Sequence, residues 1–273
     1  MEWFEAVILG LVQGLTEFLP VSSSGHLEIG KVLLGVEATD DLMFTTMVHA
    51  ATVLSTLVVF RKQIWDLLKG FFKFKYNDET DYILKIAVSI IPIMIVGLFF
   101  KDQVEALFGS IKVVGMALVL TSVLLFFSDL ASKPGKGMKH ASGARGAMAR
   151  NGISYWQAFV VGLSQSLAVI PGLSRSGTTI STGLICGVRR DVMAQFSFLM
   201  VLIPILGESF LELVGGEFSS SSVGSLPLVL GFVSAFVSGL FACKVMIALV
   251  KKARLSWFAV YCLIAAAAIF IFA

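Results

Sequence analysis

The sequence predicts an all-α polytopic membrane protein with six transmembrane helices and two re-entrant helix–loop–helix hairpins, arranged as an inverted-topology repeat. Of its 273 residues, 57% are hydrophobic and only 14% are charged, a balance that excludes an ordinary soluble domain. Several apolar runs approach or exceed the roughly 20 residues that a helix needs to span a bilayer. An internal repeat completes the argument, because one constant offset maps Ala6 to Ala158, Gln13 to Gln165 and Gly25 to Gly177.

The chain reads as one integral membrane domain, 1–273, with repeat 1 at 1–130 and repeat 2 at 153–273. The Gly-, Lys-, Ala- and Ser-rich stretch 131–152 between them is typical of a cytoplasmic linker. Each repeat begins with an apolar helix, a Ser/Gly-rich loop and a second short apolar helix. We interpret Trp3–Gly35 and Tyr155–Val188 as re-entrant hairpins, because Pro20 and Pro171 break them at their tips. Paired, interrupted apolar segments of this kind indicate a site inside the membrane where the two loops meet.

The other apolar runs predict six spans, three of them between the two hairpins. An odd number of spans inverts the second hairpin relative to the first, so that the hairpins enter from opposite faces. We expect the spans near Leu42–Phe60, Ile83–Phe100, Val113–Ser128, Val192–Val214, Leu226–Leu249 and Trp257–Phe272.

Basic residues predict the orientation of this arrangement. On the topology above, one face has only Lys31, Lys101 and Lys112. The opposite face collects Arg61, Lys62, Lys69, Lys73, Lys75, Lys85, Lys133, Lys136, Lys139, Arg145, Arg150, Arg189, Arg190, Lys244, Lys251, Lys252 and Arg254. By the positive-inside rule the rich face is cytoplasmic, and both termini and the loop from Phe100 to Lys112 are extracytoplasmic. The net charge of +3 therefore reflects the distribution of basic residues across the membrane. The sequence has no basic stripe with stacking aromatic residues that would indicate nucleic-acid binding.

Ionisable and polar residues gather in the two hairpins. Gln13 and Glu17 lie four residues apart and project from one helix face. Arg175, deep in an apolar region, supplies a planar, permanently charged fork that suits phosphate oxygens. Hydroxyls at the start of a helix favour an anion site. The candidate phosphate ligands beside Gln13 are Ser22, Ser24, Ser174, Ser176, Thr178 and Thr179, and the candidate catalytic residues are Glu17, Ser23, His26 and Arg175.

The hairpin residues have plainer interpretations as well. Glu17 can solvate a helix end at the interface, or pair with Arg175, while the serines and threonines only cap helices. The cost of ionisable groups at membrane depth favours a functional site instead. A divalent cation such as Mg²⁺ prefers oxygen ligands. Glu17, with Gln13 beside it, and the substrate phosphates could supply them. Phosphoryl chemistry on a lipid that enters sideways from the bilayer is the reaction class that these residues favour.

Two motifs, QGLTEFLPVSSSGH (Gln13–His26) and PGLSRSGTT (Pro171–Thr179), resemble those of the bacitracin-resistance family of undecaprenyl-diphosphate phosphatases. The resemblance extends over essentially the whole chain, including the FSFL stretch Phe196–Leu199. It implies a bacterial inner-membrane enzyme that removes the terminal phosphate of undecaprenyl diphosphate with Mg²⁺ or Ca²⁺. The product is the lipid carrier for peptidoglycan and envelope glycans, and lowering the diphosphate pool confers bacitracin resistance. We expect the active site to open to the outer face.

The resemblance carries over residue by residue. The family's acidic motif falls on Gln13 and Glu17, where many members have Glu in place of Gln13, and its two loop motifs fall on Pro20–His26 and Pro171–Thr179. The nucleophile remains open between Ser23 with His26 as base, His26 itself, and a metal-bound water near Glu17. The constant offset places Ser23 opposite Arg175, so we expect these side chains to face one cavity, with His26 in reach of Ser23.

Two alternatives come from other classes. Inverted repeats with polar loops at mid-membrane are typical of transporters, so a polyprenyl-phosphate carrier flippase is the first. A lipid phosphatase of the phosphatidic-acid type is the second, but His49 and His140 do not stand where its second catalytic His would be, and we interpret His49 as a polar lining residue. The partners that we expect are a polyprenyl diphosphate lipid and the bilayer. The sequence leaves the oligomeric state open, a homodimer included.

Overall fold

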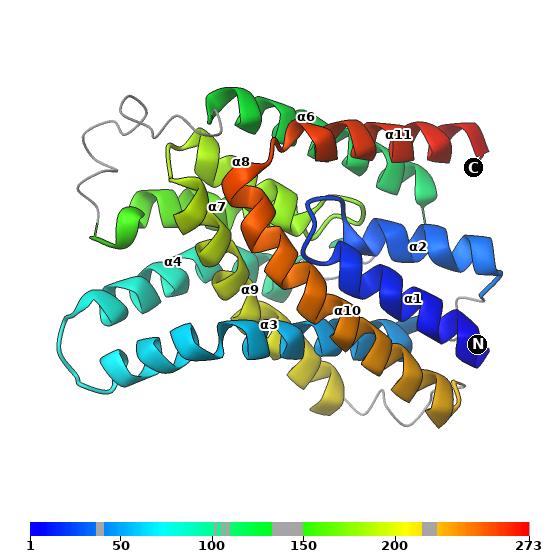
Figure 1. Ribbon diagram of the computed structural model, residues 1–273, viewed down its shortest axis with the longest axis horizontal. Coiled ribbons are helices and arrows are strands. Elements are labelled where there is room, and N and C mark those ends of the chain that lie inside the picture. Colours follow the sequence, from blue (N-terminus) through cyan, green and yellow to red (C-terminus); the bar gives the residue numbers. More distant parts are fainter. Residues whose placement is uncertain are drawn as a thin grey trace.

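The computed structural model describes residues 1–36, 41–100, 103–104, 107, 110–132, 150–214 and 223–272, and these residues form helices without a strand. Figure 1 shows their arrangement. The elements are α1 (Trp3–Thr16), α2 (Ser23–Leu34), α3 (Asp41–Phe71), α4 (Asp78–Phe99), α6 (Ile111–Ala131), a 3₁₀ turn (Arg150–Gly152), α7 (Tyr155–Leu167), α8 (Arg175–Ile185), α9 (Arg190–Val214), α10 (Ser225–Lys252) and α11 (Ser256–Phe272).

Five helices of the described chain are long and apolar enough to cross a membrane: α3, α4, α6, α9 and α10. They coincide with the first five expected spans, so the chain is a polytopic membrane protein. The sixth expected span is α11, an apolar helix of 17 residues. The largest difference from expectation is in α3, whose 31 residues continue past Phe60 to Phe71. At a rise of about 1.5 Å per residue, α3 exceeds the roughly 30 Å hydrocarbon core, so its end projects beyond it.

The expected hairpins are present as helix pairs, α1 with α2 and α7 with α8. These four helices have 14, 12, 13 and 11 residues, too few to span a bilayer. Both second helices begin with the same cap: the hydroxyl of Ser22 accepts from the backbone N–H of Gly25 at 3.2 Å, and that of Ser174 accepts from Gly177 at 3.1 Å. The repeated sequence therefore folds into the same local structure twice.

The first helix of each hairpin packs on a helix from the other half of the chain. Helix α1 lies along α10, and α7 packs against α4 (Figure 1). Both contacts depend on glycine, because a Cβ at Gly10 would lie 2.4 Å from the carbonyl oxygen of Gly231, and one at Gly162 would lie 2.2 Å from that of Ser89. Small residues at such crossings let two backbones approach closely within a membrane. The two halves are therefore interlocked and not merely joined end to end.

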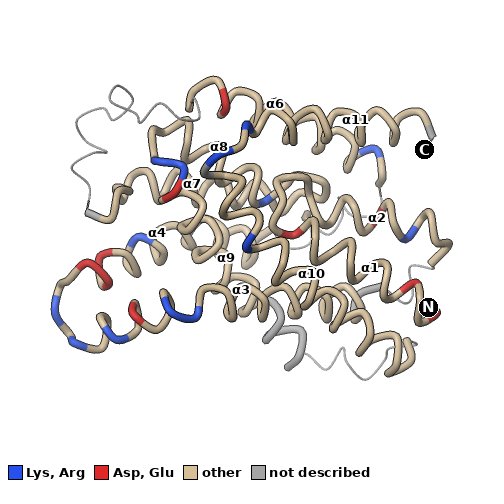
Figure 2. The backbone as a smooth tube through the Cα atoms, in the orientation of Figure 1, with Lys and Arg blue, Asp and Glu red and all other residues tan. Residues whose placement is uncertain are grey.

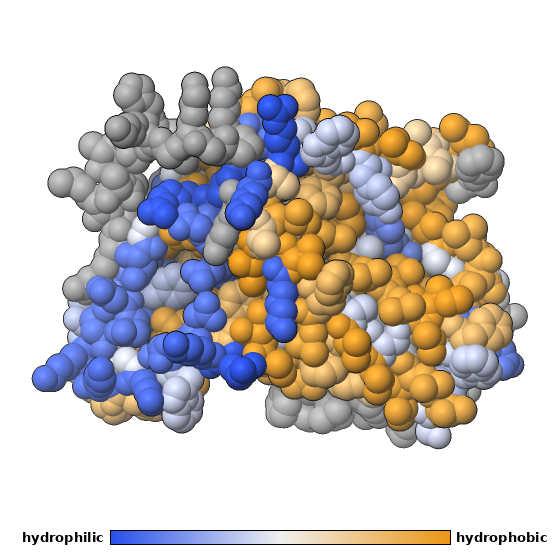
Figure 3. All heavy atoms as spheres, in the orientation of Figure 1, coloured by the Kyte–Doolittle hydropathy of each residue, from blue (hydrophilic) through white to orange (hydrophobic). Residues whose placement is uncertain are grey.

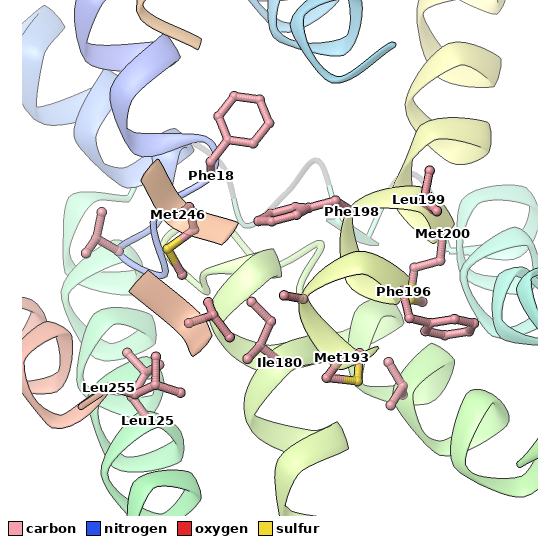
Figure 4. Close-up of a cluster of buried hydrophobic side chains, with 14 of the residues drawn as sticks. Phe18, Leu125, Ile180, Met193, Phe196, Phe198, Leu199, Met200, Met246 and Leu255 are labelled. Atoms are coloured by element: carbon pink, nitrogen blue, oxygen red, sulfur yellow. The ribbon is translucent and has the colours of Figure 1, made fainter. Parts of the chain in front are cut away.

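Buried apolar side chains fill the centre of the bundle, where α6, α8, α9 and α10 meet around residues such as Ile180, Met193, Phe196 and Met246 (Figure 4). The outside is apolar as well. In Figure 3 hydrophobic side chains cover most of the visible face, and hydrophilic ones gather over the α3–α4 hairpin. An apolar exterior around a packed core is what a lipid-facing surface requires.

Lys and Arg concentrate at the end of the molecule that carries the α3–α4 hairpin, whereas both termini lie at the opposite end (Figures 1 and 2). Within the described part of the expected basic face, Lys85 is buried and pairs with Asp81. The expected linker falls outside the described residues except at its two ends, and so do Lys101, Lys133, Lys136, Lys139 and Arg145.

Candidate active site

Glu17, at the end of α1, is the centre of the hairpin contacts. Its Oε2 accepts a hydrogen bond from Ser23 Oγ at 2.6 Å and one from Gln13 Nε2 at 2.8 Å. Its Oε1 accepts one from Arg175 Nη2 at 3.1 Å. On α3, His49 Nε2 lies 3.9 Å from Oε2. The structure thus brings together Gln13, Glu17, Ser23 and Arg175, all of which the sequence marked as site residues.

Local folding explains why these groups converge. Gln13 and Glu17 share one face of α1 because they are four residues apart. Ser23 and Arg175 are the first residues of α2 and α8, so both helix N-termini are directed toward one place. The positive ends of two helix dipoles and a guanidinium then surround one carboxylate, an environment that favours negative charge. Only Nη2 of Arg175 has a hydrogen-bond partner within the described chain, and 26% of the side chain is exposed, which leaves donors for a ligand.

The other serines and threonines mostly hold the two loops in place. Besides capping α2 and α8, Ser22 pairs with Ser24 at 3.3 Å, and Ser174 pairs with Ser176 at 3.4 Å. Ser176 also donates to the carbonyl of Leu19 at 3.0 Å, so the loops are joined to each other. Their expected contacts with phosphate stay predictions.

The two threonines of the second loop differ from each other. Thr179 donates to the Arg175 carbonyl at 2.9 Å and shares a hydrogen bond with Ser197 at 2.7 Å. Thr178 is buried, and its hydroxyl has no partner among the described residues.

His26 differs from expectation, because it makes no hydrogen bond with Ser23. Its Nδ1 lies 2.8 Å from the Ser22 carbonyl oxygen, and its Nε2 lies 2.7 Å from the hydroxyl of Tyr261 on α11. Helix α2 starts at Ser23, and on that first turn the His26 ring is directed toward α11 while Ser23 faces Glu17. The expected Ser23–His26 pair is therefore replaced by a Ser23–Glu17 pair.

A small, partly open pocket adjoins Glu17 and Arg175. Its polar part adds Thr52, Thr56, Ser176 and Ser197, and its apolar part consists of Phe18, Val53, Phe198, Val201, Leu202 and Ile205. Phe18 of the first hairpin and Phe198 of α9 lie together, with ring centres 5.8 Å apart (Figure 4). A charged end continuing into an apolar wall suits an amphiphilic ligand with an anionic head group.

Sequence reasoning missed part of this lining. His49, Thr52 and Thr56 follow one another at i, i+3 and i+7, which is a polar stripe on one face of an apolar helix. That spacing is a signal that could have identified α3 as a wall of the site, whereas only His49 was interpreted as lining. Ser197 lies within the FSFL stretch that carries part of the family resemblance, but no role was assigned to it. Tyr261 carried no comparable signal, because it stands alone in an apolar run.

The side chains available as metal ligands limit how a metal ion could be bound. Among the described residues no three His, Cys, Asp or Glu side chains gather in one place. Glu17 contributes carboxylate oxygens, and the buried Oε1 of Gln13 has no hydrogen-bond partner. Two protein oxygens suit a Mg²⁺ ion whose remaining positions are filled by substrate phosphates and water, and do not suit a site built from protein alone.

Comparison of the sequence with those of known proteins assigns this chain to a family. A protein named undecaprenyl-diphosphatase from Parabacteroides distasonis is 54% identical over 269 residues, covering 97% of this chain and 96% of that protein. One of the same name from Bacteroides fragilis is 53% identical over 268 residues, with 97% and 96% covered. Another from Halothermothrix orenii is 38% identical over 274 residues, with 100% and 99% covered. The family model described as bacitracin resistance protein BacA matches residues 6–268, and the chain belongs to that family.

Proposed function

We propose that this chain hydrolyses undecaprenyl diphosphate to undecaprenyl phosphate and inorganic phosphate. The observation that carries the proposal is the Ser23–Glu17–Arg175 arrangement at the mouth of an apolar-walled cavity. A serine beside a carboxylate and a guanidinium suits transfer of a phosphoryl group, and the apolar wall suits a prenyl chain. The names of the relatives agree with this activity. The product re-enters the lipid-carrier cycle of envelope synthesis, and removal of the diphosphate confers bacitracin resistance.

Ser23 is the nucleophile in the mechanism that the geometry supports best. Its Oγ already donates its proton toward Glu17 Oε2, so Glu17 accepts that proton as Oγ bonds to the terminal phosphorus. The bond from that phosphorus to the bridging oxygen breaks, and undecaprenyl phosphate leaves. The free N–H groups of Arg175 bind the phosphoryl oxygens as their charge changes. Water then cleaves the phosphoserine, releasing inorganic phosphate, and Glu17 returns the proton to Ser23.

Glu17 and Gln13 would hold a Mg²⁺ or Ca²⁺ ion through their oxygens, and when bound this ion neutralises diphosphate charge. The remaining hydroxyls that we assign to phosphate binding are Ser22, Ser24, Ser174, Ser176, Thr178 and Thr179. Of these residues, Ser176 lines the pocket beside Glu17 and Arg175.

Phosphate release from undecaprenyl or farnesyl diphosphate by purified protein, with and without chelator, tests the proposal. Sustained multiple turnover that chelator abolishes is the expected result. Movement of lipid carrier across reconstituted vesicles without phosphate release would favour the flippase alternative. Mass spectrometry of rapidly quenched enzyme locates a phosphorylated residue, and phosphate on His26 would contradict attack by Ser23.

We also propose the full topology: six spans including α11, two re-entrant hairpins inverted with respect to each other, and both termini outside the cytoplasm. The reciprocal packing of α1 on α10 and of α7 on α4 supports the repeat. The termini at the end opposite the basic α3–α4 hairpin support the orientation. We further propose that the active site lies within the inner membrane of a bacterium, with access from the outer face. Cysteine-accessibility labelling in intact cells tests it, and a C-terminus reachable only from the cytoplasm would contradict it.

A further inference from the structure

Helix α3 places a histidine ring beside the central carboxylate of the site. The Nε2 atom of His49 lies 3.9 Å from Glu17 Oε2 and makes no hydrogen bond within the described chain. The other ring nitrogen, Nδ1, lies 2.8 Å from the Thr45 carbonyl oxygen. A backbone carbonyl can only accept, so Nδ1 carries the hydrogen and Nε2 of the neutral ring has a lone pair. The nitrogen next to Glu17 is therefore the one that can bind a positive ion.

His49 Nε2 and Glu17 Oε2 together lack a positive partner between them. In the neutral ring and the ionised carboxyl group, both atoms carry lone pairs and neither carries a hydrogen. Their separation of 3.9 Å also exceeds that of a direct hydrogen bond. Divalent ions lie about 2.0–2.2 Å from nitrogen and oxygen ligands, so one ion can contact two atoms that are as much as about 4 Å apart. The two atoms are close enough to share one metal ion.

Gln13 offers a third ligand at the same carboxylate oxygen. Its Nε2 donates to Glu17 Oε2 at 2.8 Å, whereas its Oε1 is buried and has no partner within the described chain. Arg175 binds the other carboxylate oxygen, Oε1, at 3.1 Å. A buried acceptor without a partner is costly, and a bound cation would satisfy it. An imidazole nitrogen, a carboxylate oxygen and an amide oxygen thus stand around one side of Glu17.

The contacts of His49 are those of a metal ligand, and the contacts of His26 are not. A histidine that binds a metal usually donates its other ring N–H to a backbone carbonyl or a carboxylate. Both rings have such a carbonyl, from Thr45 for His49 and from Ser22 for His26. The Nε2 of His26, however, lies 2.7 Å from the Tyr261 hydroxyl. Of the two histidines in the described chain, only His49 has a free nitrogen.

We propose that His49 Nε2 binds the divalent cation of this site together with Glu17 Oε2 and Gln13 Oε1. Mg²⁺ and Ca²⁺ prefer oxygen ligands, whereas first-row transition ions accept imidazole nitrogen readily. The site therefore favours a transition ion such as Mn²⁺ over Mg²⁺ and Ca²⁺. The side chain of His49 is 22% exposed, which leaves the ring accessible to an ion. This inference rests on the proposed function only for the use of the ion in hydrolysis, because binding is measured without turnover.

Pulsed electron paramagnetic resonance of the Mn²⁺-loaded protein tests the proposal, because it detects nitrogen atoms that bind the ion directly. The protein should carry no polyhistidine tag, since a tag would itself supply imidazole. We expect nitrogen coupling in the wild type, with a pattern that changes when the cells are grown with ¹⁵N-histidine. This measurement needs no substitution, so it does not depend on the folding of a variant.

Substitution then identifies which histidine binds Mn²⁺. The chain has three histidines, so His49→Gln has two matched controls, His26→Gln and His140→Gln. We expect the nitrogen coupling to be lost only in His49→Gln. The same variant should bind Mn²⁺ at least roughly 10-fold more weakly, because losing even an outer-shell partner costs about 10- to 100-fold in metal affinity. Its affinity for Mg²⁺, measured by competition with Mn²⁺, should change less, since glutamine supplies an oxygen.

Absence of histidine coupling in the Mn²⁺-loaded wild type would overturn the proposal, and an imidazolium that only pairs with Glu17 would give that result. Coupling that survives in His49→Gln, or equal Mn²⁺ affinity in His49→Gln and the wild type, would overturn it as well. A protein that binds Mn²⁺ through His49 but releases no phosphate from farnesyl diphosphate would keep this inference and contradict the proposed hydrolysis.

Discussion

Replacing Glu17 by Gln tests whether its carboxylate is the chemical centre of the site. The substitution keeps the shape of the side chain and removes its charge. Three donors converge on the carboxylate, from Ser23 at 2.6 Å, Gln13 at 2.8 Å and Arg175 at 3.1 Å. An amide has one acceptor oxygen and an NH₂ group in place of two acceptor oxygens, so at least one of these donors loses its partner.

The magnitude follows from these contacts. Hydrogen bonds to charged groups contribute about 1.5–3 kcal/mol each. Arg175 keeps 26% of its side chain exposed, so leaving it unpaired costs less than the about 3–5 kcal/mol of a fully buried ion pair. We expect Glu17→Gln to lower the free energy of unfolding by about 2 kcal/mol. Loss of the proton acceptor for Ser23 should lower kcat by roughly 100- to 10,000-fold.

The assay combines initial rates of phosphate release over a range of Mg²⁺ concentrations with thermal unfolding in the same detergent. Glu28→Gln is the matched control, because it removes a carboxylate on the same hairpin that pairs only with the nearby Lys31 within the described contacts. Full activity with unchanged Mg²⁺ dependence in Glu17→Gln would refute the reasoning and make Glu17 a structural partner of Arg175. A double variant with Arg175→Gln should recover stability and not activity.

Four further predictions concern the neighbouring residues. Arg175→Lys should lose most phosphate release while folding normally by circular dichroism, since lysine cannot present a bidentate fork, and near-normal turnover would remove Arg175 from the phosphate site. Gln13→Glu should be tolerated in turnover assays, because it restores the acidic residue that many family members carry, and an inactive variant would contradict this. Ser23→Ala should abolish turnover, and retained activity would favour His26 or water as nucleophile. Ser22→Ala should keep measurable turnover but lower the melting temperature, because the lost helix cap contributes about 1 kcal/mol to the free energy of unfolding. An unchanged melting temperature would contradict a stabilising role for this cap.

The sequence was sufficient to predict the helices and most of the residues at the centre of the candidate site. The apolar runs located five helices long enough to span, and the shorter apolar helix α11, within a few residues. The exception is the end of α3, where Trp65, Leu68 and Phe71 continue the helix past the charges at Arg61 and Lys62. The repeat offset predicted that Ser23 and Arg175 would face one place, and both contact Glu17.

The partners of His26 were not predictable in the same way. Ser23 and His26 are three residues apart on one helix, a spacing that permits contact, and the alternative partner Tyr261 lies on the last helix of the chain. Nothing in a single sequence indicates that α11 packs beside the first hairpin, because this contact depends on tertiary structure. Local spacing therefore predicted which residues cluster within a hairpin, and could not predict which distant helix completes their hydrogen bonds.

The two hairpins share a backbone but divide the chemistry between them. The offset that maps Gln13 to Gln165 also maps Glu17 to Val169, Ser23 to Arg175 and His26 to Thr178. In the first hairpin Gln13 donates to Glu17, whereas in the second the amide of Gln165 is buried with no partner for either of its polar atoms within the described chain. Unpaired buried polar groups are costly, and at the equivalent place the second hairpin has Val169 where the first has the carboxylate to which Gln13 donates. In the proposed mechanism the first hairpin supplies the nucleophile and the base, and the second supplies the cation that holds the phosphate. That mechanism needs a single catalytic centre, because only the two loops together contain all three groups.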